Sequence, residues 1–344
     1  MSSDENKIDS DYWTEGLTTD STLDTYDRDE MILCVKCARK NPPTRLDCLY
    51  CGVELEMSGA ERKTLKPVLK TIAPHEKGVN LIYLANLEEW DNSRLVEVAK
   101  MSRFNRDKLR DLVDLRKPLP IARTTSGKEA EMVSLRLKEM GIKTRLISDE
   151  SFGFNKSAIR LSRINFAGEK ISLVSFNDGG ITEVLQDDIS LIVVGIIFEQ
   201  RVEATERYSK KSENKILDTS QANADQTIFD IYIKRKSDAF RVSTNGFDFS
   251  CLENEKEMLA SQNIKALFEK LNRMSRGTKL DDDYLKVRGL LTSVWGLDEH
   301  VDSKGIKRKG LNSFNKKSVT TTTNIEQFNK YSRMCWYLNN ESEK

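Results

Sequence analysis

Four cysteines stand within eighteen residues of this 344-residue chain: Cys34, Cys37, Cys48 and Cys51. They form two C-x2-C pairs separated by ten residues, which is about the spacing that a tetrahedral Zn²⁺ site uses. Gly52 follows the second pair and supplies a permissive backbone where the chain has to turn. Four sulfur ligands leave no position for water or substrate. The pattern therefore predicts a structural zinc ion and not a catalytic one.

Residues 31–56, which contain both cysteine pairs, resemble the short bacterial zinc-ribbon family. The positions that carry the resemblance are the four cysteines, Asn41-Pro42 and Gly52. The resemblance implies a zinc ribbon that needs its metal to fold, because so short a segment has little core of its own. Related fingers that bind RNA carry Trp where this chain has Ile32, and those that bind ubiquitin carry Thr-Phe where it has Ala38-Arg39. The segment therefore gives no indication that it binds RNA or ubiquitin.

Bulk composition indicates a multi-domain soluble protein. A chain of 344 residues exceeds the length at which one core stops growing. Its 55 Lys and Arg balance 54 Asp and Glu, so overall charge names no partner. The longest apolar run, residues 189–198, is ten residues long, against the roughly twenty that a membrane span needs. The acidic start is unlike a signal peptide, and we expect a cytoplasmic protein without a membrane span.

Local motifs for catalysis are not found in the sequence. The stretch Ser126-Gly-Lys128 lacks the upstream glycine and the following Ser or Thr of a phosphate-binding loop. His75 and His300 are the only histidines, and Cys251 and Cys335 are isolated cysteines. We therefore expect no enzymatic activity and name no catalytic residue, while an active site assembled across domains without a local motif stays open.

The two ends of the chain have opposite charge. Residues 1–30 hold ten Asp or Glu against two basic residues, which predicts a disordered acidic tail; a docking motif around Trp13 is the alternative. Residues 276–344 predict a helical extension, with a helix over residues 281–295, and a basic C-terminal tail. Residues 304–317 carry six basic residues and no acidic one. This segment is either a flexible solvated stretch or a binding site for nucleic acid or an anionic membrane.

Residues 79–148 predict a small α+β sandwich, in the order strand, helix, helix, strand, helix, strand. Ser126 or Gly127 begins the last helix, and Gly141 caps it. The stretch from Ser126 to Ile142 resembles the C-terminal domain of the ribosomal stalk protein, which shares its fold with the Clp protease adaptor. That family contacts translation factors through a glycine-punctuated segment. Here Met101–Lys108 has no glycine, so protein docking rather than translation-factor binding is implied.

Residues 156–275 predict a meander of short strands, a long apolar strand from Ile189, a polar loop over residues 210–226, further strands, and one amphipathic helix over residues 262–274. Strands closed by a single helix resemble the pleckstrin-homology or GRAM-like plan, a β-barrel with a capping helix. Lipid-head binding in that plan would need a basic first hairpin, whereas Ala167-Gly-Glu169 is acidic beside Lys170. Protein binding is therefore favoured over lipid binding.

Together these segments predict a multi-domain α+β protein with a zinc ribbon, a small α+β sandwich and a pleckstrin-homology-like barrel. The first functional hypothesis is a non-enzymatic zinc-binding module for protein interaction or regulation, with an unknown protein partner. The alternative is a nucleic-acid- or ribosome-associated factor that uses the zinc ribbon and the basic tail. No residue of the sequence names a partner, a pathway or an oligomeric state.

Overall fold

The computed structural model describes residues 26–56, 69, 72–73, 76–85, 90–209, 212–275, 277–310 and 313–342. The chain divides into two compact units, residues 1–68 and residues 69–344. Both helices and several sheets are present, so the mixed α+β class is confirmed. Most of the expected acidic tail, residues 1–25, lies outside the described residues. Within the described parts, no helix is long and apolar enough to cross a membrane.

The first unit contains a minimal sheet around the cysteine pairs. Strand β1 (Ile32–Leu33) pairs antiparallel with β2 (Lys40–Asn41). An isolated antiparallel bridge joins Asp47 to Glu54 around the second cysteine pair. The few buried side chains around these strands include Ile32 and Leu55 as well as the cysteines Cys34 and Cys48. So small an apolar core needs a further source of stability.

The second unit begins with a three-stranded antiparallel sheet in the order β4-β3-β5. The order of strands and helices predicted for residues 79–148 is confirmed, and Ser126 caps α4 by accepting the N–H of Glu129 at 3.2 Å. Asp91 and Asn105 cap α2 and α3 in the same way. The elements are β3 (Val79–Tyr83), α2 (Asn92–Ser102), α3 (Arg106–Asp114), β4 (Leu119–Thr124), α4 (Gly127–Glu139), β5 (Thr144–Ser148) and α5 (Asp149–Phe152).

A larger sheet follows, with the strand order β13-β14-β9-β10-β11-β6-β7-β8, and β12 pairs with β9 beside this path. Strands β6 and β11 pair in parallel, whereas β6, β7 and β8 form the predicted antiparallel meander. Helix α6 (Ala260–Met274) matches the amphipathic helix expected there. The other elements of this stretch are β6 (Ile159–Ala167), β7 (Lys170–Ser175), β8 (Ile181–Leu185), η2 (Gln186–Asp188), β9 (Ile189–Ser209), β10 (Ser212–Ile233), β11 (Ala239–Ser243) and η3 (Phe249–Glu255).

Three expectations from the sequence are wrong. The polar loop predicted over residues 210–226 is replaced from Ser212 onward by β10. The basic stretch 304–317, predicted as a tail, lies in the hairpin of β13 (Asp298–Gly310) and β14 (Ser313–Thr323). The helix expected over residues 281–295 is shorter, because Asp281 ends strand β12 (Lys279–Asp281) and α7 spans Tyr284–Leu291. Polar strands exposed on two faces lack the alternating pattern that identifies a strand, which explains the first two errors.

Two hydrophobic cores hold the second unit together. One core is formed by α6, η3 and the strands around β6, β7, β10 and β11, with Leu267 and Phe229 at its centre. The other joins residues 81–152 to strands β9 and β10 and to helices α7 and α8 (Ile325–Ser342). Trp295 and Phe328 are fully enclosed in this second core. The segment 79–148 therefore buries its apolar side chains against elements far along the chain, while its separation as a domain stays a prediction.

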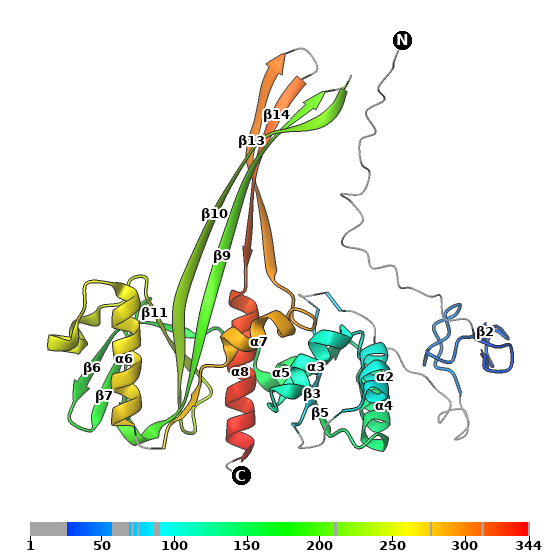
Figure 1. Cartoon of the computed structure of the whole chain (residues 1–344), viewed down its shortest axis with the longest axis horizontal. Coiled ribbons are helices and arrows are strands. Elements are labelled where there is room, and N and C mark those ends of the chain that lie inside the picture. The colour runs from blue at the N-terminus through cyan, green and yellow to red at the C-terminus, as the bar shows by residue number, and fades with distance from the viewer. Residues whose placement is uncertain are drawn as a thin grey trace. The chain divides into compact units, whose positions relative to one another are not determined.

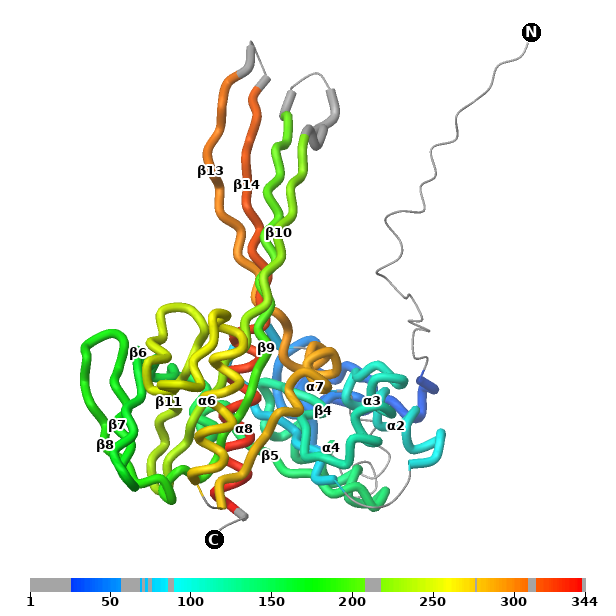
Figure 2. Tube along the Cα trace, turned by 60° about the vertical axis from the view of Figure 1, so that its left-hand side comes forward, coloured from blue at the N-terminus to red at the C-terminus, as the bar shows by residue number. Residues whose placement is uncertain are grey.

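Strands β9, β10, β13 and β14 form a four-stranded arm. In Figures 1 and 2 their outer parts extend beyond helices α7 and α8. Asn324, at the start of α8, fixes the inner end: its amide oxygen accepts the N–H of Phe198 at 2.9 Å and its amide nitrogen donates to the Ile196 carbonyl at 3.2 Å. At Gly195 the ring of Phe328 approaches so closely that an added Cβ would lie 2.4 Å from Cε2. Helix α8 thus anchors the arm to the unit.

Candidate metal centre and a buried polar network

The four cysteine sulfurs lie together. All four Sγ atoms of Cys34, Cys37, Cys48 and Cys51 are within 4.8 Å of one another. The Sγ atoms of Cys34 and Cys51 are 3.6 Å apart, and those of Cys37 and Cys48 are 3.5 Å apart. None of the four is in a disulfide. The residues singled out by spacing alone are thus brought to one point, as a metal site requires.

Two tight backbone turns aim the sulfurs inward. In the first turn the N–H of Ala38 donates to the Cys34 carbonyl at 2.8 Å, and in the second the N–H of Gly52 donates to the Cys48 carbonyl at 2.9 Å. The residue after each pair has positive φ, at 54° for Ala38 and 69° for Gly52. Glycine adopts this conformation without strain, whereas alanine pays a steric cost. The two turns are equivalent, and each presents a pair of thiols to the same space.

Asn41 connects the two turns. This side chain is fully buried; its amide oxygen accepts the N–H of Leu49 at 2.8 Å and its amide nitrogen lies 3.5 Å from the Cys48 sulfur. The N–H of Tyr50 also donates to that sulfur, at 3.4 Å. Donors around a sulfur stabilise its thiolate form and orient it as a metal ligand.

Two of the thiols, those of Cys37 and Cys48, have strongly shifted pKa values. Burial acts to raise the pKa of Cys48, but N–H donors from Tyr50, Cys51 and Asn41 outweigh it and lower that pKa to about 6. For Cys37 the N–H of Arg39 acts to lower the pKa, but desolvation and the neighbouring thiols raise it to about 12. One thiolate therefore forms readily, and its charge opposes the formation of the next. A bound divalent cation would remove this opposition.

The donor set fits a structural metal. Four cysteine sulfurs within reach of one point could hold a metal ion, and a zinc-ribbon-like site of this kind is complete with four ligands. No fifth His, Cys, Asp or Glu belongs to this group among the described residues. Such an arrangement stabilises a fold and has no position at which a substrate could reach the ion.

Four large apolar side chains around the cluster are exposed to solvent. Exposed fractions are 53% for Leu33, 64% for Val35, 51% for Leu49 and 54% for Tyr50. The guanidinium carbon of Arg39 lies 4.7 Å from the centre of the Tyr50 ring. These side chains flank the metal ligands in the sequence, so a rigid cluster would hold them in fixed positions.

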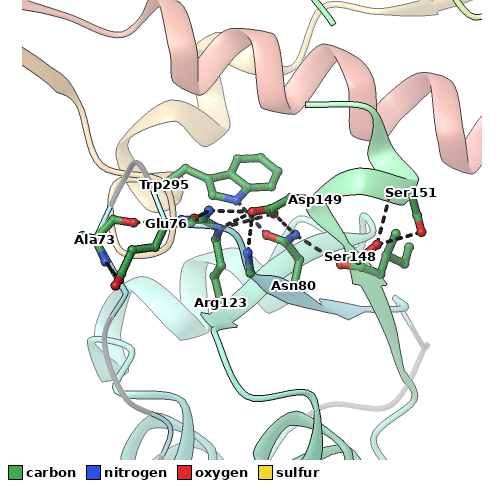
Figure 3. A network of polar contacts seen from close by, with 10 residues as sticks. Ala73, Glu76, Asn80, Arg123, Ser148, Asp149, Ser151 and Trp295 are labelled. Carbon is green, nitrogen blue, oxygen red and sulfur yellow. Dashed lines mark hydrogen bonds and ion pairs between the residues drawn. The ribbon is translucent and has the colours of Figure 1, made fainter. Parts of the chain in front are cut away.

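A second candidate site lies in the larger unit, where four segments meet at the carboxylate of Asp149 (Figure 3). This carboxylate accepts the Arg123 guanidinium at 2.6 Å, the Asn80 amide at 2.7 Å and the N–H of Gly78 at 2.8 Å. The Asn80 oxygen in turn accepts the indole N–H of Trp295 at 3.0 Å. The side chains of Arg123 and Asp149 are only 4% and 13% exposed. The network therefore ties β3, β4 and α5 to the segment after α7.

A cavity of about 470 Å³ opens beside this network. Burial raises the pKa of Asp298, although its carboxylate accepts the N–H of Glu326 at 3.2 Å. Burial, and then the charge of Arg123, lower the pKa of Lys330. The lining residues that carry charge include Glu76, Arg123, Asp149, Asp298, Glu326 and Lys330. Shifted titrating groups around a cavity are a common mark of functional sites, but structural networks produce them too.

The sequence singled out none of these network residues. They stand at positions 80, 123, 149 and 295, and no local motif links them. Two further networks join distant segments. In one, Asp230, paired with Arg241 at 2.7 and 2.8 Å, accepts the Ser332 hydroxyl of α8 at 2.7 Å. In the other, Lys117 contacts Asp281 and Tyr331. The two isolated cysteines take no part in the metal cluster. Burial raises the pKa of both, to about 11 for Cys251 and further for Cys335.

Comparisons with known proteins add no relative: a scan against protein-family models and searches of curated proteins and of solved structures each found no match to this chain. The resemblances described from the sequence thus gain no support from them. The function has to be argued from the two sites and from the surface of the structure.

Proposed function

We propose that this chain is a non-enzymatic zinc-binding protein that serves in protein interaction or regulation. The observation that carries the proposal is the group of four cysteine sulfurs within 4.8 Å of one another. Zn²⁺ is the metal that four thiolates in two tight turns favour. Its role is structural, because four protein ligands complete its coordination. The bound metal stabilises a segment whose apolar core is small.

The absence of enzymatic activity is part of the same proposal. The cavity in the larger unit has charged groups, but the carboxylate of Asp149 is engaged by three donors. These three donors leave at most one of its four acceptor positions for a substrate, and its ion pair joins separate segments. These contacts favour a structural role for the network.

The finer assignments of fold and place belong to the same proposal. Residues 31–56 form a zinc ribbon, residues 79–148 an adaptor-like α+β domain, and residues 156–275 a pleckstrin-homology-like domain capped by α6. The strand and helix order of the last two segments supports them, and the resemblance is one of fold alone. The protein acts in the cytoplasm, where clustered cysteines bind metal rather than form disulfides.

Cobalt substitution tests whether the metal is structural. The purified chain is loaded with Co²⁺ in place of Zn²⁺, and its absorption spectrum is recorded with and without azide. A closed site of four thiolates gives a tetrahedral sulfur-to-cobalt spectrum that azide leaves unchanged. A spectrum altered by azide would show an open coordination position and would contradict the structural role.

The interaction role is tested on the exposed side chains beside the cluster. Leu49→Ser with Tyr50→Ser removes apolar surface from the ribbon and keeps all four cysteines. The matched control is Leu135→Ser on α4, where the side chain is 61% exposed. Cross-linking in cells should yield a protein adduct that the ribbon variant loses and the control keeps. Adducts that are the same for both variants would count against a ribbon-mediated interaction.

The second candidate function is a nucleic-acid- or ribosome-associated factor. One specific observation favours it: the basic stretch 304–317 lies on the exposed arm and not in a loose tail. The ribbon contributes less to this candidate, since residues 26–56 hold five basic and six acidic residues.

A further inference from the structure

The arm has a strongly uneven distribution of charge. Its outer part, the described residues 204–209, 212–217, 303–310 and 313–317, is called the arm tip here; it holds eight Lys or Arg against two Glu, a net charge of +6. Its inner part, residues 198–203, 218–226, 298–302 and 318–323, holds seven Asp or Glu against one Arg, a net charge of −6. The whole chain has a net charge of only +1. The positive charge is therefore concentrated at the outer end of the arm.

Strand pairing brings this charge together from segments about a hundred residues apart. Strand β14 lies between β13 and β9, and β9 pairs with β10. Lys307 pairs with Asn315, Asn315 pairs with Arg207, and Arg207 pairs with Lys215. Paired positions of neighbouring strands share a face, so Lys307 and Arg207 lie on the same face of the tip. Lys316, one residue along from Asn315, lies on the opposite face.

The arm tip is exposed on both faces. None of its described side chains, at residues 204–207, 303–308 and 314–317, is buried. The arm is also long: from Phe198 to the end of β9 at Ser209 the strand extends roughly 40 Å at about 3.3 Å per residue. Figures 1 and 2 show no helix of the unit against this outer part. A large partner could therefore reach both faces.

Protection of sheet edges does not account for this charge. Lysines on an edge strand prevent edge-to-edge aggregation, and β13 is an edge strand. However, Arg207 lies on β9 and Lys316 on β14, both of which pair on two sides. Lys316 pairs with Glu206 across β14 and β9. Lys317 forms an ion pair with Glu203 at 2.8 Å, so part of the charge is balanced within the arm. The inner part of the arm, with a charge of opposite sign, is equally well paired. The net excess of positive charge at the tip is therefore not a requirement of strand pairing.

A polyanionic partner would account for this excess of charge, and nucleic acid fits better than a membrane. A flat bilayer would meet one face of the tip, whereas basic side chains lie on both faces. A single strand of nucleic acid can follow the arm around its edge and bring phosphates to both faces.

We propose that the arm tip binds nucleic acid through phosphate contacts made by residues of β9, β13 and β14. The inference rests on the second candidate function proposed above and names the residues of the arm that would contact the nucleic acid. Contacts of this kind give affinity that falls steeply with salt and carry little sequence preference. The acidic inner part of the arm repels the polyanion, which confines binding to the tip.

The test measures binding of the full chain to labelled nucleic acid by fluorescence anisotropy over a series of NaCl concentrations. The probes are a DNA duplex, single-stranded DNA and single-stranded RNA, all of mixed sequence. The tip variant combines Arg207→Gln, Lys307→Gln and Lys316→Gln. The control variant combines Lys138→Gln, Lys143→Gln and Lys256→Gln, which removes the same charge from exposed sites elsewhere. A third variant, Arg207→Lys with Lys307→Arg and Lys316→Arg, keeps the charge of the tip.

The expected result is salt-dependent binding by the unchanged chain, the control and the charge-keeping variant. If all three tip positions contact phosphates, the tip variant should show a slope of log K against log salt that is smaller by about 2–3, and an affinity on the order of 10²-fold lower near 0.1 M salt. Equal thermal midpoints show that the variants fold.

Three results would overturn the proposal: equal binding by the tip and control variants, no binding to any of the probes at low salt, or binding to phosphatidylserine vesicles in place of nucleic acid. None of these results changes the cobalt spectrum. Failure of this inference is therefore distinguishable from failure of the proposed metal-binding role.

Discussion

Replacement of Asp149 by alanine tests the reasoning about buried networks most sharply. The substitution removes the carboxylate that pairs with Arg123 at 2.6 Å and that also accepts from Asn80 and Gly78. The Arg123 side chain is only 4% exposed and its other acceptors are the neutral carbonyls of Ala73 and Glu76, so its charge stays largely buried without a carboxylate. The guanidinium charge is then uncompensated, the Gly78 N–H loses its acceptor, and the Asn80 amide keeps only the Ile147 carbonyl at 3.2 Å.

The expected loss of stability is large. Removing one partner of a buried ion pair costs about 3–5 kcal/mol, because an uncompensated charge stays buried. The exposed pair of Arg136 with Glu97 has the same chemistry at 3.1 Å, but its side chains are 43% and 44% exposed. Breaking such a surface pair costs about 0–1 kcal/mol. Both are ion pairs between an arginine and a carboxylate, and they differ mainly in how deeply they are buried.

Differential scanning calorimetry of Asp149→Ala and Glu97→Ala compares the two pairs. At roughly 2–4 °C for each kcal/mol, the buried substitution should lower the unfolding midpoint of the larger unit by about 6–20 °C, and the surface substitution by about 4 °C or less. Adding Arg123→Met to Asp149→Ala should recover part of the loss, since it removes the unpaired charge. Equal midpoints for Asp149→Ala and Glu97→Ala would refute the argument from burial.

Further predictions concern single positions. Gly195→Ala should lower the unfolding midpoint, because the new Cβ would lie 2.4 Å from the Phe328 ring; Phe328→Leu in the same chain should recover part of the loss, and an unchanged midpoint for Gly195→Ala would contradict the close contact. The lowered pKa of Lys330 means that its charged form opposes folding below that pKa and that the opposition fades as pH rises through it. Lys330→Met should therefore raise the unfolding midpoint at neutral pH, and this gain should shrink at high pH. A lower unfolding midpoint for Lys330→Met at neutral pH would contradict the prediction. Asn41→Ala should weaken metal binding by about 10–100-fold in competition with a chelator, and equal binding would remove Asn41 from the support of the ligands.

The metal cluster could be predicted from the sequence because its information is local. The spacing of the cysteines and Gly52 fixes two turns, and each turn needs only its own residues. The capped helices were predictable for the same reason: Ser126 and the apolar positions after it lie within one segment. Local signals of this kind do not depend on what the rest of the chain does.

The arm and the buried network could not be predicted, because their partners are distant in sequence. Strand β9 pairs with β14, which lies about 110 residues later in the chain. The outer part of β9 lacks the alternation of apolar and polar residues that identifies a strand in a sequence. Asp149 is one of many acidic residues in the sequence, and only its burial beside Arg123 distinguishes it. Burial is a property of the complete fold. In the sequence alone, the basic hairpin therefore resembles a tail, and no residue of the network stands out.

The metal content of the purified chain tests the central claim most directly. The full chain, expressed with zinc in the medium and dialysed, is measured by inductively coupled plasma mass spectrometry beside Cys48→Ser and, as a matched control, Cys251→Ser. The account predicts one zinc per chain for the unchanged protein and the control, and a loss of zinc in Cys48→Ser. A metal-free chain, or the same zinc content in all three proteins, would contradict it.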